Sequence, residues 1–254
     1  MALEPTFTTF AAGPVFPSTD DHCNLRVVRT RPRVSLHQLA QYMEATPARR
    51  RQIIASEKYP SPFRVSYEPA KRMFREALRL GWDEEMLFGL ASERWFSTPV
   101  ESDLADFRRR QAMDAVAEFC DLLEPVKEQL ATSDASIRLA GRLWAPLELG
   151  GVLVVDSPDL VLRRFRRGDD EVGVLTFNVS KTKQHDEVSA QRAAALLMAV
   201  AAENKTASTT LSPDLCMVAC VFSGIIVDAD RGNERRLRRA ERACEEIAAM
   251  WDHV

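Results

Sequence analysis

Two spacings of apolar residues divide the chain. From about residue 34 to 133 they recur every three to four positions, as they do along one face of an α-helix. Met73, Phe74 and Ala77 belong to one such stripe. After Ser133 the pattern changes to short runs rich in β-branched and aromatic residues, which is typical of strands. We therefore predict helices first and a sheet afterwards.

Capping residues suggest where the helices of the first half begin and end. Ser35 precedes an apolar stripe, and its hydroxyl can accept a hydrogen bond from a free amide of the first turn. Thr46 followed by Pro47 predicts a second start, because proline is tolerated at the first helical position. The longest helical pattern covers about 102–130, and we expect Pro125 to kink or break it.

The second half mixes strand and helix patterns. Residues 160–165 and 172–179 predict two strands joined by a polar turn. Residues 188–203 return to helical spacing, and so do 233–251. The most continuous apolar run is 216–230, which fits either one buried strand or a hairpin.

These patterns predict an α+β (or α/β) protein in three parts. They are an arm over 1–33 interrupted by prolines, a helical segment over 34–133, and a small mixed sheet flanked by helices over 134–254. A chain of 254 residues can bury a core as one domain or as two.

Composition narrows the class of protein. Apolar residues make up 46% and charged residues 28%, ordinary values for a globular protein. A net charge of −3 excludes a polycationic nucleic-acid coat but allows local basic patches. No apolar run approaches the roughly 20 residues that span a bilayer, so we expect no membrane partner. Five cysteines without a C-x-x-C spacing, and no basic leader, favour a reducing, cytoplasmic location.

Asp159 is the first candidate for chemistry. It follows Pro158 at the head of the strand predicted over 160–165, where a carboxylate can face a cleft. Carboxylate oxygens are the ligands that Mg²⁺ prefers. The order Ser-Pro-Asp is equally common in plain turns, where the acid only closes the turn. The residues alone leave both interpretations open.

Residues 144–203 resemble the RecB-like branch of the PD-(D/E)XK nuclease superfamily in their order of strand, turn, strand and helix. In that family the first strand supplies an acid, the second an acid-x-Lys pair, and a nearby helix a glutamine. Asp159 matches the acid and Gln191 matches the glutamine. The resemblance implies a nucleic-acid partner and, if the protein is active, phosphodiester hydrolysis with Mg²⁺ or Mn²⁺.

The second strand departs from the family pattern. Positions 173–178 contain neither an acid nor a lysine. If the protein is active, Glu171 before them and Lys181 after them are the candidate substitutes, which gives a catalytic set of Asp159, Glu171, Lys181 and Gln191 with Asp159 as metal ligand. Metal-assisted hydrolysis needs at least two convergent oxygen ligands. We therefore predict a catalytically degenerate platform that binds nucleic acid, with no certain cofactor.

Basic side chains gather near the predicted hairpin and at the start of the last helix. The candidate nucleic-acid-binding residues are Arg166, Arg167, Lys183, Arg235 and Arg236. Cations at a helix N-terminus add to its partial positive charge and suit a phosphate ligand. They also suit neighbouring acids, so a solvated and internally paired face is the alternative.

Two other interpretations rest on the first half. Residues 35–59 contain two short helical patterns around Thr46, with arginines in the second, as in a helix-turn-helix that enters a major groove. The other interpretation is a non-catalytic interaction or regulatory protein whose helical segment docks a protein partner. The four histidines have no metal-ligand spacing and do not decide between them.

Overall fold

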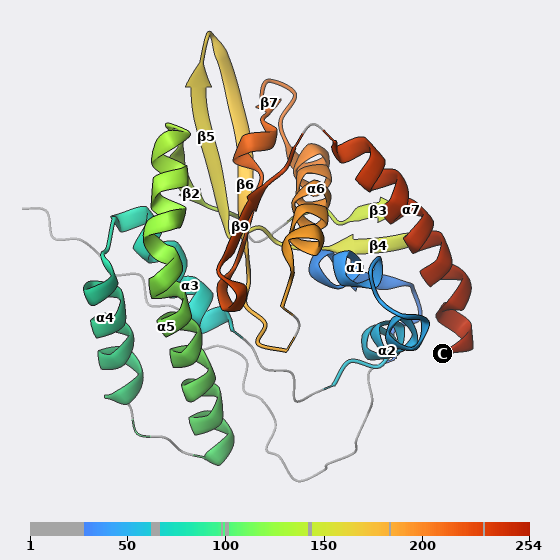
Figure 1. Cartoon of the computed structure of the whole chain (residues 1–254), viewed down its shortest axis with the longest axis horizontal. Helices are drawn as coiled ribbons and strands as arrows, with labels where there is room; N and C mark the ends of the chain where they lie inside the picture. The colour runs from blue at the N-terminus through green and yellow to red at the C-terminus, as the bar shows by residue number, and fades with distance from the viewer. Residues whose placement is uncertain are drawn as a thin grey trace, which may run out of the picture.

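The computed structural model describes residues 28–61, 67–97, 99, 102–141, 144–182, 184–230 and 232–254. Within these ranges the fold is α+β, with helices on both sides of a mixed sheet and a second, smaller sheet (Figure 1). The predicted α+β class is confirmed. None of the described helices is long and apolar enough to cross a membrane.

The helices are α1 (Leu36–Tyr42), α2 (Pro47–Lys58), α3 (Glu68–Leu80), α4 (Glu84–Phe96), α5 (Asp103–Thr132), α6 (Glu187–Asn204) and α7 (Asn233–Met250). The strands are β1 (Arg33–Ser35), β2 (Ser136–Leu139), β3 (Leu147–Leu149), β4 (Val152–Val155), β5 (Leu160–Arg166), β6 (Asp169–Asn178), β7 (Thr210–Leu211), β8 (Met217–Cys220) and β9 (Ile225–Asp228).

The larger sheet has the order β2-β5-β6-β8-β9, with β7 beside the start of β6. Strand β5 pairs antiparallel with both β2 and β6, and α6 then crosses over so that β8 runs parallel to β6. A parallel pair requires such a crossover. The apolar run 216–230 is a hairpin of β8 and β9, and Gly224 takes the left-handed φ of 65° between them.

The smaller sheet has the order β1-β4-β3, which corrects the prediction of a single sheet. Strand β1 pairs in parallel with β4, with Val34 opposite Val154. It also crosses the expected boundary between the arm and the helical segment. Three residues are too few to show a period of two, and their partner lies far along the chain, so no local pattern predicts this strand.

The caps of the first two helices were predicted correctly, because a cap depends on a few neighbouring residues. Ser35 and Thr46 cap α1 and α2 as expected. Helix α5, however, runs through Pro125 without a break, which corrects the expected interruption. Pro125 and Asp121, four residues earlier, are both exposed, so the carbonyl without an intrahelical partner lies on the side facing water. Helix α7 has Gly232 at its N-cap, so no side chain caps this helix.

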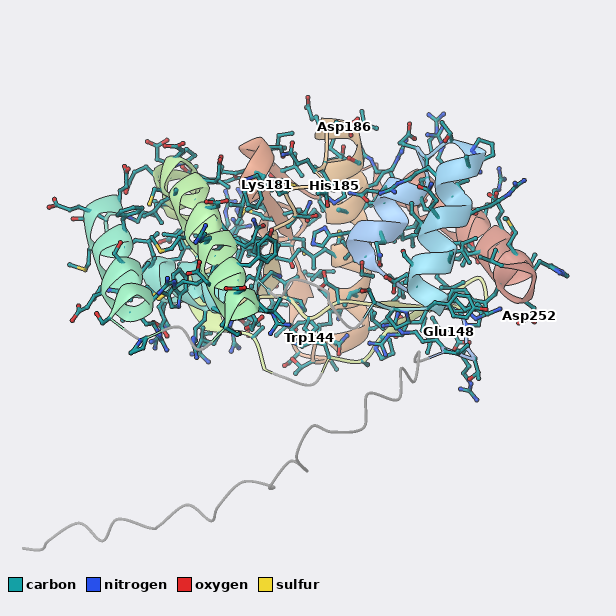
Figure 2. The ribbon with its side chains drawn as sticks, turned by 90° about the horizontal axis from the view of Figure 1, so that it is seen from below. Trp144, Glu148, Lys181, His185, Asp186 and Asp252 are labelled. Carbon is teal, nitrogen blue, oxygen red and sulfur yellow. The ribbon has the colours of Figure 1, made fainter. Side chains whose placement is uncertain are left out.

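The larger sheet separates two apolar cores. One face packs on α3, α4 and α5, where the ring of Phe74 stacks on Phe119 at 4.0 Å and both meet the edge of Phe177. The other face packs on α6, and α1, α2, α7 and the smaller sheet complete that core. The view from below shows helices on both sides of the sheet (Figure 2). The helices of residues 34–133 therefore divide between the two faces.

Candidate functional site

Asp159 lies immediately before β5, where the connection from β4 enters the larger sheet. Its backbone amide donates to the carbonyl of Leu175 at 2.9 Å, which fixes the residue against β6. Its side chain is only 2% exposed. A buried carboxylate costs several kcal/mol unless it is paired and hydrogen-bonded. Its partners therefore decide what it can do.

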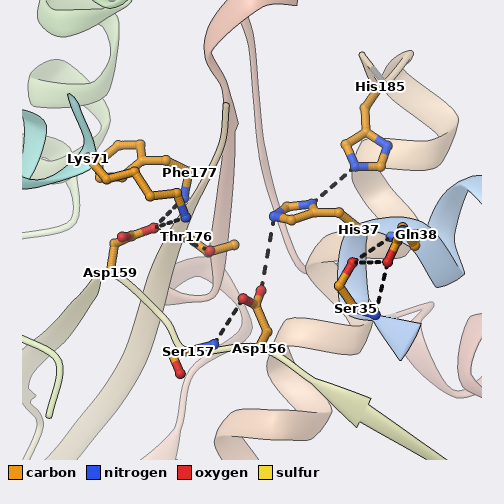
Figure 3. Close-up of polar contacts among 10 residues, drawn as sticks. All are labelled: Ser35, His37, Gln38, Lys71, Asp156, Ser157, Asp159, Thr176, Phe177 and His185. Carbon is orange, nitrogen blue, oxygen red and sulfur yellow. Dashed lines mark hydrogen bonds and ion pairs between the residues drawn. The ribbon is translucent and has the colours of Figure 1, made fainter. Parts of the chain in front are cut away.

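Two cations and the backbone satisfy the Asp159 carboxylate. Oδ2 accepts from Lys71 Nζ at 3.0 Å and from the backbone amide of Phe177 at 2.8 Å, with the hydroxyl of Thr176 at 3.4 Å. Oδ1 accepts from Arg75 Nη1 at 3.1 Å. Figure 3 shows Lys71, Thr176 and Phe177 converging on Asp159. We call these five residues the Asp159 cluster.

Lys71 and Arg75 share one face of α3, because residues four apart lie one above the other on a helix. Burial alone would lower the pKa of Lys71, but the nearby carboxylates of Asp159 and Asp156 outweigh burial and raise it. Lys71 is therefore an ammonium at neutral pH. Sequence reasoning missed both cations, because a lysine and an arginine beside an apolar stripe are usually part of a solvated face.

A second carboxylate, Asp156, lies beside the cluster. Burial raises its pKa to about 6, an effect that Lys71 partly offsets, and the backbone amide of Ser157 donates to its Oδ1 at 2.9 Å. Its Oδ2 lies 4.0 Å from Nε2 of His37. That separation is too long for a hydrogen bond. Asp156 follows β4, so the smaller sheet brings it to this position.

His37 continues this line of polar groups into the other core. Its Nδ1 lies 3.1 Å from Nε2 of His185, which precedes α6 (Figure 3). Burial lowers the pKa of each histidine to about 3, so the pair is neutral at pH 7. One ring nitrogen donates and the other accepts. The two histidines meet in space although they have no informative spacing in the sequence.

The other predicted catalytic residues lie in separate contacts. Glu171 forms an ion pair with Arg164 at 2.6 Å. Lys181 pairs with Asp114 of α5 at 3.2 Å, and Figure 2 shows it near that helix. Gln191 accepts a hydrogen bond from Arg236 at 2.9 Å. The described contacts of Glu171, Lys181 and Gln191 include no member of the Asp159 cluster.

A cleft of about 780 Å³ opens in front of Asp159 between α3 and the end of β2. Its charged lining residues are Glu68, Lys71, Arg72, Arg75, Glu76 and Asp159. The three cations and three anions balance. Among the described residues no group of three His, Cys, Asp or Glu side chains converges as metal ligands.

The predicted nucleic-acid-binding residues divide into exposed and paired ones. Arg166 and Arg167 are exposed at the turn between β5 and β6, and Arg235 is exposed on α7. Arg236 forms an ion pair with Asp230 and donates a hydrogen bond to Gln191, so its role in binding stays a prediction. Lys183 lies outside the described residues.

The basic surface of α7 extends further along the helix than the arginines at its start, which the sequence already shows as a cluster. Arg235, Arg238, Arg239 and Arg242 line one shallow pocket of about 280 Å³, and we call these four residues the arginine ridge. Arg238 is 3.5 Å from Glu234. Across the described ranges the other three make no ion pair. Their spacing of i, i+4 and i+7 places them on one face and could have been read from the sequence.

Comparisons with known protein families, with curated proteins and with solved structures find no match for this chain.

Proposed function

We propose that the chain is a nucleic-acid-binding protein with a PD-(D/E)XK-like fold that does not cleave its ligand. The arrangement of β5, β6 and α6 supports this proposal: two adjacent antiparallel strands are followed by a helix that packs on the same sheet. Asp159 stands at the head of the first of these strands, beside β6. The resemblance to the PD-(D/E)XK nucleases implies this order of elements, with an acid at the head of the first strand.

The proposal that the protein does not cleave its ligand rests on the carboxylate of Asp159, whose oxygens are already engaged in hydrogen bonds. The ammonium of Lys71 and the guanidinium of Arg75 already hydrogen-bond to the Asp159 oxygens whose lone pairs a divalent ion would need. A divalent ion placed there would repel both cations, at several kcal/mol each in a partly buried site. The side chains of β6 that lie closest to the Asp159 carboxylate are neutral, and Thr176 is the nearest of them.

The arginine ridge supports the proposal that the protein binds nucleic acid. Its members span about 10 Å of α7, given a rise of about 1.5 Å per residue. Arginine forms bidentate hydrogen bonds to phosphate and stays charged at every physiological pH. Because Arg235, Arg239 and Arg242 have no acid partner among the described residues, their charge is available to a polyanion.

The test is a salt titration of binding to labelled duplex DNA, duplex RNA and single strands, followed by fluorescence anisotropy. The variant Arg239→Ser/Arg242→Ser should weaken duplex DNA binding and reduce the slope of log affinity against log salt by about 1.8, at about 0.9 for each lost phosphate contact. The matched control is Arg79→Ser/Arg108→Ser, which removes two exposed arginines elsewhere and should leave affinity nearly unchanged.

No binding by the parent at low salt would overturn the proposal. Equal weakening by the ridge variant and by the control variant would show that only net charge matters and would remove the ridge as the binding surface. A structurally intact variant is expected, because the two substituted side chains are exposed and make no described ion pair.

A second candidate function is protein interaction through the helical half. Large apolar side chains of α4 and the start of α5 are between 37% and 49% exposed, namely Met86, Phe88, Leu90, Leu104 and Phe107. Apolar patches of this kind mark interaction surfaces. A stoichiometric protein partner that is lost with Phe88→Glu and kept with Arg239→Ser/Arg242→Ser would favour this candidate.

A further inference from the structure

The β5–β6 hairpin extends beyond the rest of the larger sheet. Strand β2 pairs with β5 only as far as Arg163, and β7 pairs with β6 only from Glu171 onward. The hairpin residues between these limits have only each other as strand partners in the described chain. Figure 1 shows the hairpin projecting past the helices that cover the sheet.

Ion pairs hold the base of this projection rigid. Arg164 is 8% exposed and donates to Glu171 at 2.6 Å, to Asp214 at 2.8 Å and to the carbonyl of Ser133 at 3.2 Å. The hydrogen bonds that Arg164 donates to the carboxylates of Asp214 and Glu171 raise its pKa, so this side chain stays charged. The hairpin is therefore anchored to the 3-10 turn before β8 and to the end of α5.

The turn itself is short and fixed. Arg167 and Gly168 form a two-residue connection, and their φ angles are 53° and 91°. Positive φ at both central residues matches the twist of antiparallel strands. Across the strands Arg163 Nε donates to Asp170 Oδ1 at 2.6 Å. The direction in which the tip points is thus set before any ligand binds.

An aromatic ring stands at this tip with arginines beside it. Phe165 is 75% exposed, the highest value among the described large apolar side chains. Arg166 and Arg167 are exposed and make no ion pair within the described ranges. Arg163 pairs with Asp170, and Arg164 at the base pairs with both Glu171 and Asp214. Over 165–169 two arginines stand against one acid, Asp169, so the tip itself has a net charge of +1 beside an open ring.

We propose that Phe165 stacks on an unpaired base of a single-stranded nucleic acid while Arg166 and Arg167 contact the adjacent phosphates. This inference rests on the proposed nucleic-acid binding and names its ligand class. A duplex hides its base faces, whereas every base of a single strand offers one. A ring and guanidinium groups on a rigid, positively charged projection suit that ligand, because stacking needs an open π-face and phosphates need cations.

The experiment compares the full-length protein with Phe165→Ala on a labelled oligothymidylate and on a duplex of the same length. Loss of one stacked base should weaken single-strand binding by about 5- to 150-fold and leave duplex binding unchanged. Phe165→Trp should restore single-strand affinity, and its added indole fluorescence should be quenched by the oligothymidylate. Phe88→Ala, another exposed phenylalanine, is the matched control and should behave as the parent.

The outcomes separate this inference from the proposed function. If the parent binds nucleic acid and Phe165→Ala binds both ligands as the parent does, the stacking role is overturned and nucleic-acid binding stands. Equal weakening on both ligands also overturns it, because stacking requires an unpaired base. If the parent binds neither ligand at low salt, the proposed function fails and the inference fails with it.

Discussion

The Asp159 cluster and the arginine ridge use the same kinds of charged groups in opposite ways. In the cluster, cations from α3 surround a carboxylate that is 2% exposed, and every charge has a partner. On the ridge, three exposed arginines of α7 lack an acid partner in the described chain. Paired buried charges fix a structure, whereas unpaired exposed charges can attract a ligand. The carboxylate that the sequence singles out is thus closed by its own cations, and the charges that stay open lie on α7.

The largest expected effect is on stability at the cluster. Asp159→Asn should lower the free energy of unfolding by about 2–3 kcal/mol, because it leaves the partly buried cations Lys71 and Arg75 without the anion they share, although Arg75 keeps its ion pair with Glu68. Urea denaturation measures this loss. On the ridge, Arg242→Ser should change stability by no more than about 0.5 kcal/mol.

A compensating variant sharpens the same comparison. Lys71→Met/Asp159→Leu removes the two opposite charges together and should recover part of the loss, because replacing a buried pair with apolar groups is often neutral. A cost of less than about 1 kcal/mol for Asp159→Asn alone would mean that Asp159 is not paired in solution and is available as a ligand.

The next effect concerns pH. His37 and His185 have pKa values of about 3 in the folded protein and 6.5 as model values, so the penalty for keeping them neutral is absent above pH 6.5 and grows as pH falls. Asp156 acts in the opposite sense: its folded pKa of about 6 contributes stability below 3.8 that is lost as pH rises through 6. Between pH 6 and 4 the unfolded chain holds about two more protons at the histidines than the folded chain does, and the folded chain holds up to one more at Asp156.

The net contribution of these three groups is therefore a loss of about 1.4 kcal/mol of stability per pH unit as pH falls from 6 to 4. The variant His37→Asn/His185→Asn should remove the histidine part, so its profile should differ from the parent's by roughly 2–3 kcal/mol per pH unit. Urea denaturation across this pH window measures both slopes. If stability depends on pH in the same way in the parent and in the variant, these histidines titrate normally in the folded protein.

Local features of the fold could be predicted from the sequence, and contacts between distant segments could not. The caps at Ser35 and Thr46, the hairpin before β6 and the position of Asp159 each depend on a few neighbouring residues. Strand β1 depends on a partner strand nearly half the chain away, so its three residues predict nothing alone. The expected break at Pro125 is wrong because water around an exposed helix face can replace the backbone hydrogen bond that proline cannot donate.

The candidate site shows the same limit. The absence of an acid and a lysine over 173–178 is visible in the sequence, and β6 indeed places Thr176 beside Asp159. What closes the carboxylate is Lys71, which lies far away in the sequence on a helix of the opposite half. No spacing rule connects α3 to β5. The pairing follows from α3 packing in the core beneath the sheet, which is a tertiary fact.

The smallest expected effect is the response to metal. Millimolar Mn²⁺ or Mg²⁺ should shift the melting temperature of the parent by less than about 1 °C, because the lone pairs of Asp159 are engaged by Lys71, Arg75 and the amide of Phe177. A true site at 100 times its dissociation constant would add about 2.7 kcal/mol, or roughly 5–10 °C for a chain of this size. The same metal should leave plasmid DNA uncut. A saturable rise in melting temperature that Asp159→Asn abolishes would show that the cations yield to the metal, and the cluster would then be an open site like the ridge.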